Sequence, residues 1–286
     1  METKKERGIL ASDGMRRFLK NRLSILGTAI LLLFVFSALF ADLIAPYPYD
    51  EQNLEAVYQS PSLAHPFGTD AVGRDQFSRV IHGGRASLSI GFSSMGIALV
   101  FGIVLGCVAG FYGGGYDSAV MRVMDMMMAI PSVLLAIVIT SALGPSLFNL
   151  TLAMGISSVP SYARITRASI MSIRGSEYIE AARLGGCSDV RIIARHVLPN
   201  ILAPLIVQAT LSLGLAILNA SGLSFLGLGV QPPTPEWGSM LAAARGEIRN
   251  YPYLLVFPGC AIALVVLALN MVGDGLRDAL DPRMKS

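Results

Sequence analysis

Residues Glu177–Pro199 read EYIEAARLGGCSDVRIIARHVLP, a charged island of 23 residues in an otherwise apolar chain. Ser176 is a favourable N-cap residue, and Glu177 and Glu180 occupy the turn after it, where carboxylates stabilise the positive end of a helix. A short helix is therefore predicted to begin here. One of its faces carries small side chains and a single aromatic ring, at Tyr178, Ala181, Ala182 and Gly185. Such a face permits close approach by a partner.

A second short helix is predicted directly after the first. Gly185-Gly186 is expected to end the first helix, because glycine accepts the left-handed backbone of a C-cap. Ser188-Asp189 is expected to begin the second helix, and Leu198-Pro199 to end it. The apolar positions of the second helix are Val190, Ile193, Ala194 and Val197. The pattern thus predicts two short helices at an angle, surrounded by Arg183, Arg191 and Arg195.

The composition of the whole chain is typical of an integral membrane protein. Its 286 residues have a mean hydropathy of +0.59, are 53% hydrophobic and are only 14% charged, which is too apolar for an ordinary soluble domain. The net charge of +3 is small, so no nucleic-acid partner is expected. The three cysteines lie in three separate segments and indicate no disulfide framework.

Six apolar runs are long enough to cross a bilayer, which needs about 20 residues per helix. They are residues 23–45, 86–111, 119–143, 147–163, 201–228 and 253–272. The sequence therefore predicts an all-α membrane protein with six transmembrane helices. The predicted organisation is an N-terminal segment 1–22, a first span 23–45, a polar segment 46–85, a core 86–275 that includes the island 177–199, and a tail 276–286. No low-complexity tract or strand-like alternation is evident.

The polar segment 46–85 contains the stretch HPFGTDAVGRDQFSRVIHGGR at residues 65–85. Glycines bracket a short amphipathic run in it that carries Phe77, Val80 and Ile81 on one side. We predict a separate helix here that lies along the membrane surface.

The distribution of Lys and Arg predicts the orientation, because loops on the cytoplasmic side are enriched in these residues. With six spans, 17 of the 22 basic residues belong to one side, which also holds both termini and the island. Only Arg74, Arg79, Arg85, Arg245 and Arg249 fall on the other. Both termini and the island are therefore expected to be cytoplasmic, in a multi-pass membrane protein.

The chain lacks the common signatures of catalysis. There is no G-x-x-x-x-G-K-[ST] loop, and the only lysines lie near the two ends of the chain, so no phosphate-binding loop is expected. His65, His82 and His196 have no other potential zinc ligands at a suitable spacing in the sequence. No G-x-S-x-G nucleophile elbow is present. We predict no catalytic residue, no metal site and no cofactor bound by this chain.

Polar residues at membrane depth are the candidates for a transport pathway, because their burial in a bilayer is costly. Asp125 follows Arg122 by three residues, and a structural pair on one helix face is the preferred interpretation over a substrate role. Gln208 and Asn219 are eleven residues apart, about three turns, so they share a helix face. That face either lines a polar path or forms interhelical hydrogen bonds, and the sequence does not decide between the two.

A loop rich in proline precedes Trp237, in the stretch GLSFLGLGVQPPTPEWGSML at residues 222–241. An interfacial anchor is the simplest physical role for this tryptophan, because indole rings favour the membrane–water boundary.

The island resembles the EAA motif of ABC-type importer permeases, which is Glu-Ala-Ala, three residues, Gly, nine residues, Ile, one residue, Leu-Pro. The corresponding positions here are Glu180, Ala181, Ala182, Gly186, His196, Leu198 and Pro199. Only His196 departs from the pattern. In that family the motif forms a cytoplasmic coupling helix that docks into a separate ATPase subunit. The resemblance therefore implies an ATPase-docking surface at Tyr178, Glu180, Ala181, Ala182, Leu184, Gly185 and Gly186.

Residues 65–85, 222–241 and 273–283 extend this resemblance to nearly the whole chain. Together with the island they are similar to the C-type permease subunit of dipeptide and oligopeptide ABC importers, a family with nickel and glutathione members. The resemblance implies a type I importer fold, a core of five helices after an extra N-terminal one. It also implies a homologous second permease, two ATPase subunits that use ATP and magnesium, and an extracytoplasmic substrate-binding protein. The proline-rich loop would then lie near the mouth that receives the binding protein.

Peptides are the expected cargo, with nickel, glutathione or another small solute as alternatives within the same family. Two other classes of protein remain open on the residues alone. One is an ion-coupled secondary transporter with Asp125 as its ion site. The other is a membrane-embedded enzyme that uses Asp125 with Asn270 or Asp274.

Overall fold

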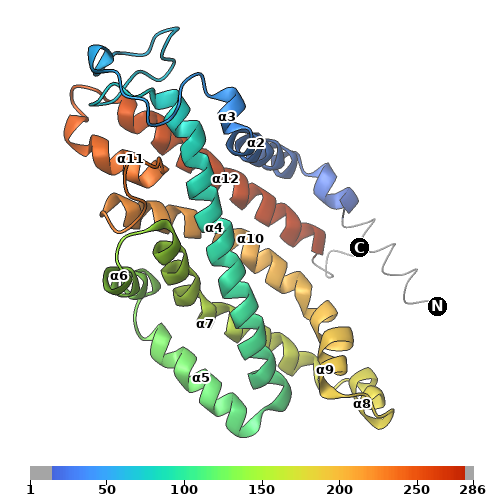
Figure 1. Ribbon diagram of the computed structural model, residues 1–286. Helices are drawn as coiled ribbons and strands as arrows, with labels where there is room; N and C mark the ends of the chain where they lie inside the picture. The colour runs from blue at the N-terminus through green and yellow to red at the C-terminus, as the bar shows by residue number, and fades with distance from the viewer. Residues whose placement is uncertain (1–14, 281–286) are drawn as a thin grey trace.

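A computed structural model describes residues 15–280 of the chain (Figure 1). The α-helices are α2 (Arg22–Leu39), α3 (Ala41–Ile44), α4 (Gln76–Cys107), α5 (Gly114–Met128), α6 (Ser132–Leu143), α7 (Leu147–Ile173), α8 (Glu177–Leu184), α9 (Asp189–Ile192), α10 (Leu198–Phe225), α11 (Trp237–Ala244) and α12 (Tyr253–Leu280). Two π-helical turns, Val108–Tyr112 and Ile193–Val197, and two 3₁₀ turns, Leu54–Ala56 and Arg245–Glu247, complete the helical structure. Residues 15–20 are also helical. An isolated bridge between Thr69 and Asp75 is the only β-pairing in this part of the chain.

Each predicted span corresponds to a long helix or a pair of helices. Four helical stretches are long and apolar enough to cross a membrane by themselves: α2, Gln76–Tyr112, Asp189–Phe225 and α12. The pair formed by α5 and α6 passes the same test together and makes a fifth. The sixth, α7, is 27 residues long but is less apolar, since it carries Arg164, Arg167 and several serines. The protein is thus an all-α membrane protein.

The separate amphipathic helix predicted before residue 85 is wrong. Residues 76–107 form one continuous helix, α4, which Asp75 caps by accepting a hydrogen bond from the Ser78 N–H at 2.7 Å. Gly83 and Gly84 do not break this helix. Both lie against the indole of Trp237, and a Cβ atom added at either glycine would come within 3.2–3.3 Å of the ring. These two glycines therefore provide room for a long-range contact that helical periodicity does not reveal.

The third predicted span is broken where a single helix was expected. α5 and α6 meet at an angle of 86°. Pro131 lies in the break as the residue before α6, with an extended backbone (φ −52°, ψ 132°). Proline cannot donate the hydrogen bond that would continue α5, which explains the position of the bend.

Pro199 does not end a helix either, contrary to the prediction. The π-helical turn Ile193–Val197 leads from α9 directly into α10, and Pro199 occupies the first turn of α10. A missing N–H is tolerated in the first turn of a helix. The chain therefore runs from α9 into the membrane helix without a loop.

Close helix packing holds α4 against α7. Gly102 and Gly106 face Tyr162 and Thr166, and a Cβ at either glycine would collide with those residues. Gly27 of α2 packs in the same way against α12, at Ala268 and Met271. Small residues allow such approach in a bilayer, where apolar lipid gives helices little hydrophobic drive to associate. Gly102 and Gly106 of α4 thus serve close helix packing.

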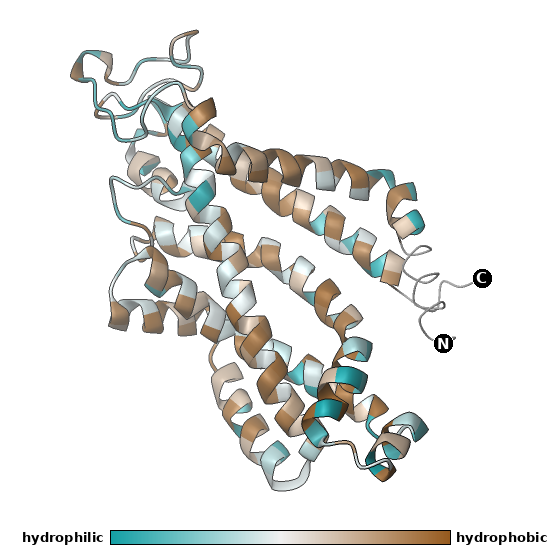
Figure 2. Ribbon diagram, turned by 45° about the vertical axis from the view of Figure 1, so that its right-hand side comes forward, coloured by the Kyte–Doolittle hydropathy of each residue, from teal (hydrophilic) through white to brown (hydrophobic). Residues whose placement is uncertain are grey.

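The molecule has two different polar ends. We call the part formed by α8 and α9 (Glu177–Ile192) the hairpin. We call the part formed by residues 46–75, the first turns of α4, the proline-rich loop 229–236 and α11 the loop end. Figure 1 shows the hairpin at the lower right and the loop end at the upper left, with the start of α2 and the end of α12 directed toward the hairpin side. Figure 2 shows hydrophobic residues along the long helices and hydrophilic residues gathered mainly toward these two ends.

Candidate functional site: the hairpin and a polar cavity

The turn between the two helices of the hairpin depends on a glycine in a left-handed backbone conformation. α8 begins after Ser176 and ends before Gly185, and Gly186 follows with φ +73°. The Gly186 N–H donates to the Arg183 carbonyl at 3.0 Å, and the Cys187 N–H donates to the Ala182 carbonyl at 3.1 Å. This pair of bonds is the Schellman motif, which favours glycine at the position of Gly186.

Most of the predicted docking residues lie on the surface. Tyr178, Glu180, Ala181, Leu184, Gly185 and Gly186 are exposed, and Ala182 is half-buried. Leu184 is 90% exposed and Val190 of α9 is 73% exposed. Two apolar side chains that a water-soluble surface would bury are therefore displayed on adjacent helices.

Sequence reasoning missed the residues that attach the hairpin to the membrane helices. Ile179 and Ile192 are fully buried, in one cluster with Val197, Ile170 and Phe111. The predicted apolar face of the second helix was only partly right, because Val190 and Ala194 point outward and Ile192 points inward. Each helix of the hairpin thus contributes one isoleucine to the core.

Two arginines connect this region to the end of α4. The Arg183 guanidinium lies 5.0 Å from the centroid of the Phe111 ring, a cation–π contact. Arg174 Nη1 donates to the Gly110 carbonyl at 3.2 Å. Both acceptors belong to the π-helical turn Val108–Tyr112, a type of distortion that recurs at functional sites. The hairpin therefore contacts α4 as well as the two helices that flank it in sequence.

Asp125 is paired across helices, where a partner on its own helix was expected. Its carboxylate accepts from Arg164 of α7, and Arg122 forms no ion pair with it. A second ion pair of the same kind joins Asp117 of α5 to Arg167 of α7, with Nη2 to Oδ2 at 2.6 Å. These two arginines of α7 thus fix α5 against α7. Periodicity within one helix gave no signal for either pair.

A polar cavity of about 270 Å³ lies between α4, α6, α7 and α10. It is lined by Ser94, Met95, Ala98, Ser132, Val133, Met154, Ser157, Ser158, Ser161, Tyr162, Gln208, Ser212, Leu215, Ala216 and Asn219. None of these side chains is charged. Ser132, Ser161 and Leu215 are exposed, so the cavity opens at the surface of the chain.

The structure brings Gln208 and Asn219 together in this cavity, as their shared helix face suggested. Gln208 Nε2 donates to Ser212 Oγ at 2.8 Å within α10, so its side chain makes no interhelical hydrogen bond among the described residues. Asp125 does not line the cavity.

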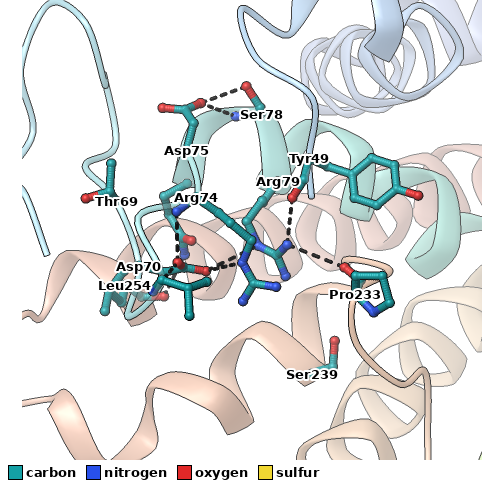
Figure 3. Close-up of polar contacts among 12 residues, drawn as sticks. Tyr49, Thr69, Asp70, Arg74, Asp75, Ser78, Arg79, Pro233, Ser239 and Leu254 are labelled. Atoms are coloured by element: carbon teal, nitrogen blue, oxygen red, sulfur yellow. Dashed lines mark hydrogen bonds and ion pairs between the residues drawn. The ribbon is translucent and has the colours of Figure 1, made fainter. Parts of the chain in front are cut away.

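The loop end is tied together by a buried arginine (Figure 3). The Arg79 side chain is 7% exposed, and its Nη1 donates to the Tyr49 carbonyl at 2.8 Å and to the Pro233 carbonyl at 3.4 Å. Asp70 Oδ2 lies 3.8 Å from Arg79 Nε and accepts from Arg74 Nε at 2.7 Å. One charged side chain thereby links the segment before α4 with the proline-rich loop.

Trp237 is an internal residue, and the interpretation as an interfacial anchor is wrong. It is fully buried, its Nε1 donates to the Val80 carbonyl at 2.8 Å, and its ring meets Phe34 edge-on with centroids 5.8 Å apart. Glu236 beside it is also fully buried and caps α11, accepting from the N–H groups of Gly238 at 3.0 Å and Ser239 at 2.9 Å. α11 is therefore locked against α4 by packing and by its own cap.

Tyr58 belongs to the same end and has an unusual backbone, with φ +53°. Its ring stacks on Tyr251 with centroids 4.1 Å apart. Burial raises the pKa of the Tyr58 hydroxyl, and the nearby Glu247 carboxylate raises it further. The hydroxyl consequently stays neutral throughout the physiological pH range.

Groups that would suggest a metal centre are not found among residues 15–280, since no three His, Cys, Asp or Glu side chains cluster there. All three cysteines are free thiols.

Residues 102–286 match the model of the family described as binding-protein-dependent transport system inner membrane component, and residues 10–61 match the N-terminal TM domain of oligopeptide transport permease C. The dipeptide transport system permease protein DppC of Alkalihalophilus pseudofirmus is 49% identical over 96% of this chain and 90% of its own length. The glutathione transport system permease protein GsiD of Pectobacterium atrosepticum is 40% identical over 95% and 90%.

Among solved structures, an inward-facing conformation of the MetNI methionine ABC transporter superposes with a TM-score of 0.58. That match covers 71% of this chain and 96% of the other, at 18% sequence identity. A similarity at this level shows a common fold, and it is the fold of a type I importer permease.

Proposed function

Because the chain belongs to the family of binding-protein-dependent transport system inner membrane components, we propose that it is a permease subunit of an ATP-driven importer whose cargo is dipeptides or oligopeptides. The carrying observation is the hairpin, which displays apolar side chains at one end of a bundle of membrane helices. Relatives named as dipeptide permeases at 43–50% identity support peptide cargo. Relatives named as glutathione permeases, at 40–43% identity, make glutathione the alternative.

The hairpin is the surface for a separate ATPase subunit in this proposal. Leu184, Val190 and Tyr178 supply an apolar contact, and the small residues Ala181 and Gly185 let the groove of the partner approach the backbone. ATP hydrolysis then takes place on the partner, and this chain binds no cofactor itself. Two such ATPase subunits, one homologous second permease and an extracytoplasmic binding protein complete the complex.

The orientation follows from the same assignment. The hairpin, the start of α2 and the end of α12 face the cytoplasm, where ATP is available, and the loop end faces outward toward the binding protein. The protein is a multi-pass component of the cell membrane, which is the inner membrane if the cell has two.

Movement of the ATPase passes into the membrane through three helices. α8 and α9 continue into α7 and α10 on either side, and Arg183 bears on Phe111 in the π-helical turn of α4. Of the residues that line the polar cavity, three belong to α4, five to α7 and five to α10. A rigid hairpin that tilts therefore moves walls of the cavity directly.

The test is charge reversal on the hairpin in the assembled complex, reconstituted with its partners in liposomes. Glu180→Lys should abolish peptide-stimulated ATP hydrolysis and uptake, because Glu180 is exposed at the position of the motif glutamate. Glu177→Lys is the matched control, with the same charge change one turn earlier on the same helix, and should retain most of the uptake. Normal uptake by Glu180→Lys would contradict the docking assignment.

A further inference from the structure

The polar cavity has a chemical character that the proposed function alone does not specify. Nine of its fifteen lining side chains are polar, and all nine are neutral: six serines with Tyr162, Gln208 and Asn219. An ionised cargo group would find no counter-charge on this wall. A bare divalent cation would find no carboxylate, imidazole or thiolate ligand either.

Several of the hydroxyl groups that line the cavity already donate a hydrogen bond within their own helix. Ser94 donates to the Gly91 carbonyl at 3.0 Å, and Ser157 and Ser158 donate to the Met154 carbonyl at 3.0 and 2.9 Å. A hydroxyl that donates within its own helix retains lone pairs for another donor. These three serines therefore offer acceptors to a bound molecule.

Other lining groups retain donors. Ser212 Oγ accepts from Gln208 Nε2, which leaves its own proton available and fixes the Gln208 amide with its carbonyl oxygen as a free acceptor. Tyr162 is 2% exposed, and its hydroxyl has no hydrogen-bond partner within residues 15–280. A buried hydroxyl without a hydrogen-bond partner costs free energy, so a bound molecule that pairs with the Tyr162 hydroxyl is expected.

We propose that this cavity is a binding site for the backbone of a peptide cargo. The side chains of the serines, Tyr162, Gln208 and Asn219 form hydrogen bonds with the N–H and C=O groups of that backbone. Binding therefore does not depend on the charge of the peptide's side chains. Each peptide unit carries one donor and one acceptor, which matches the mixed set on the wall. The cavity opens at Ser132, Ser161 and Leu215, so the second permease covers it and completes the site. This inference rests on the proposed function.

The experiment uses the complete complex in liposomes with three tripeptides of one backbone, Ala-Ala-Ala, Ala-Lys-Ala and Ala-Glu-Ala. The rates at which the wild-type complex takes up the three peptides should differ by less than about threefold, after correction for the measured affinity of the binding protein for each peptide. Gln208→Leu should slow all three by about tenfold, the effect of one lost hydrogen bond to a desolvated group. Gln208→Glu should introduce a preference, with the Lys peptide faster than the Glu peptide by about tenfold or more.

Thr210→Val is the matched control, since Thr210 lies on the same helix, is no lining residue and satisfies its hydroxyl on the Ile206 carbonyl. It should transport all three peptides like wild type. Copurification of each variant with its partners establishes assembly. If wild type transports the peptides but Gln208→Glu shows no charge preference, the backbone site is wrong and the proposed function stands. If wild type transports none of them, the proposed function itself fails.

Discussion

The two polar ends of the molecule are built in opposite ways. At the loop end, Arg79, Glu236 and Trp237 are buried and each of them hydrogen-bonds to another segment or to its own helix cap. At the hairpin, Leu184 is 90% exposed and Val190 is 73% exposed. The loop end satisfies its polar groups and buries its apolar side chains internally, whereas the hairpin leaves apolar side chains exposed. In the function proposed here, the hairpin transmits force from the ATPase and the loop end holds the helices in place.

The largest effect on stability is expected from Trp237→Ala at the loop end. The substitution opens a cavity beside Gly83, Gly84 and Phe34 and removes the bond to the Val80 carbonyl, which should cost about 3–5 kcal/mol. Thermal unfolding of the purified protein in mild detergent measures this. Trp237→Phe is the control and should recover much of the loss. An unfolding midpoint for Trp237→Ala equal to wild type would show that the loop end is not the stabilising one.

A smaller effect is expected from Arg79→Met, which keeps the length of the side chain. It leaves the carbonyl groups of Tyr49 and Pro233 without their buried donor, at a cost of about 1–3 kcal/mol. The same thermal assay applies. Arg245→Met is a suitable control, because Arg245 directly follows α11, is exposed and makes no side-chain hydrogen bond or ion pair among residues 15–280. An equal loss of thermal stability in the two variants would show that Arg79 has no special role in holding the loop end together.

The smallest effect on stability, and a large one on assembly, is expected from Leu184→Asp. A side chain that is 90% exposed contributes little to the fold, so the free energy of unfolding should change by less than about 0.5 kcal/mol. ATPase retained during purification should fall at least about tenfold, because the change places a charge in an apolar contact. Ile179→Asp on the same helix sharpens the contrast, since Ile179 is fully buried and this variant should lose stability as well.

Local sequence signals predicted the hairpin because its determinants are local. The two glutamates and Gly186 mark the ends of α8 within a few residues, and the structure has the helix at those bounds. Ser176 occupies the N-cap position as predicted, but its hydroxyl donates to the Ile173 carbonyl at 2.7 Å and makes no capping bond. The same holds for the length and approximate bounds of the long helices, which depend on runs of apolar residues.

Several of the errors concern contacts between distant segments. Gly83 and Gly84 indicated a helix end, but the partner that explains them is Trp237, more than 150 residues later. Arg122 was the nearest candidate for Asp125 in sequence, whereas α7 brings Arg164 closer in space. For the cavity, Gln208 and Asn219 were found by spacing on one helix, but the serines of α4, α6 and α7 join them only through packing.

The most direct test of the account is photo-cross-linking in native membranes with a benzophenone amino acid at Tyr178 of the hairpin. Leu63, fully exposed at the loop end, is the control position. The account predicts that Tyr178 captures an ATPase subunit, identified by mass spectrometry, and that Leu63 does not. Capture of the ATPase from Leu63, or none from Tyr178 in a complex active in transport, would contradict the assignment of the hairpin as the coupling surface.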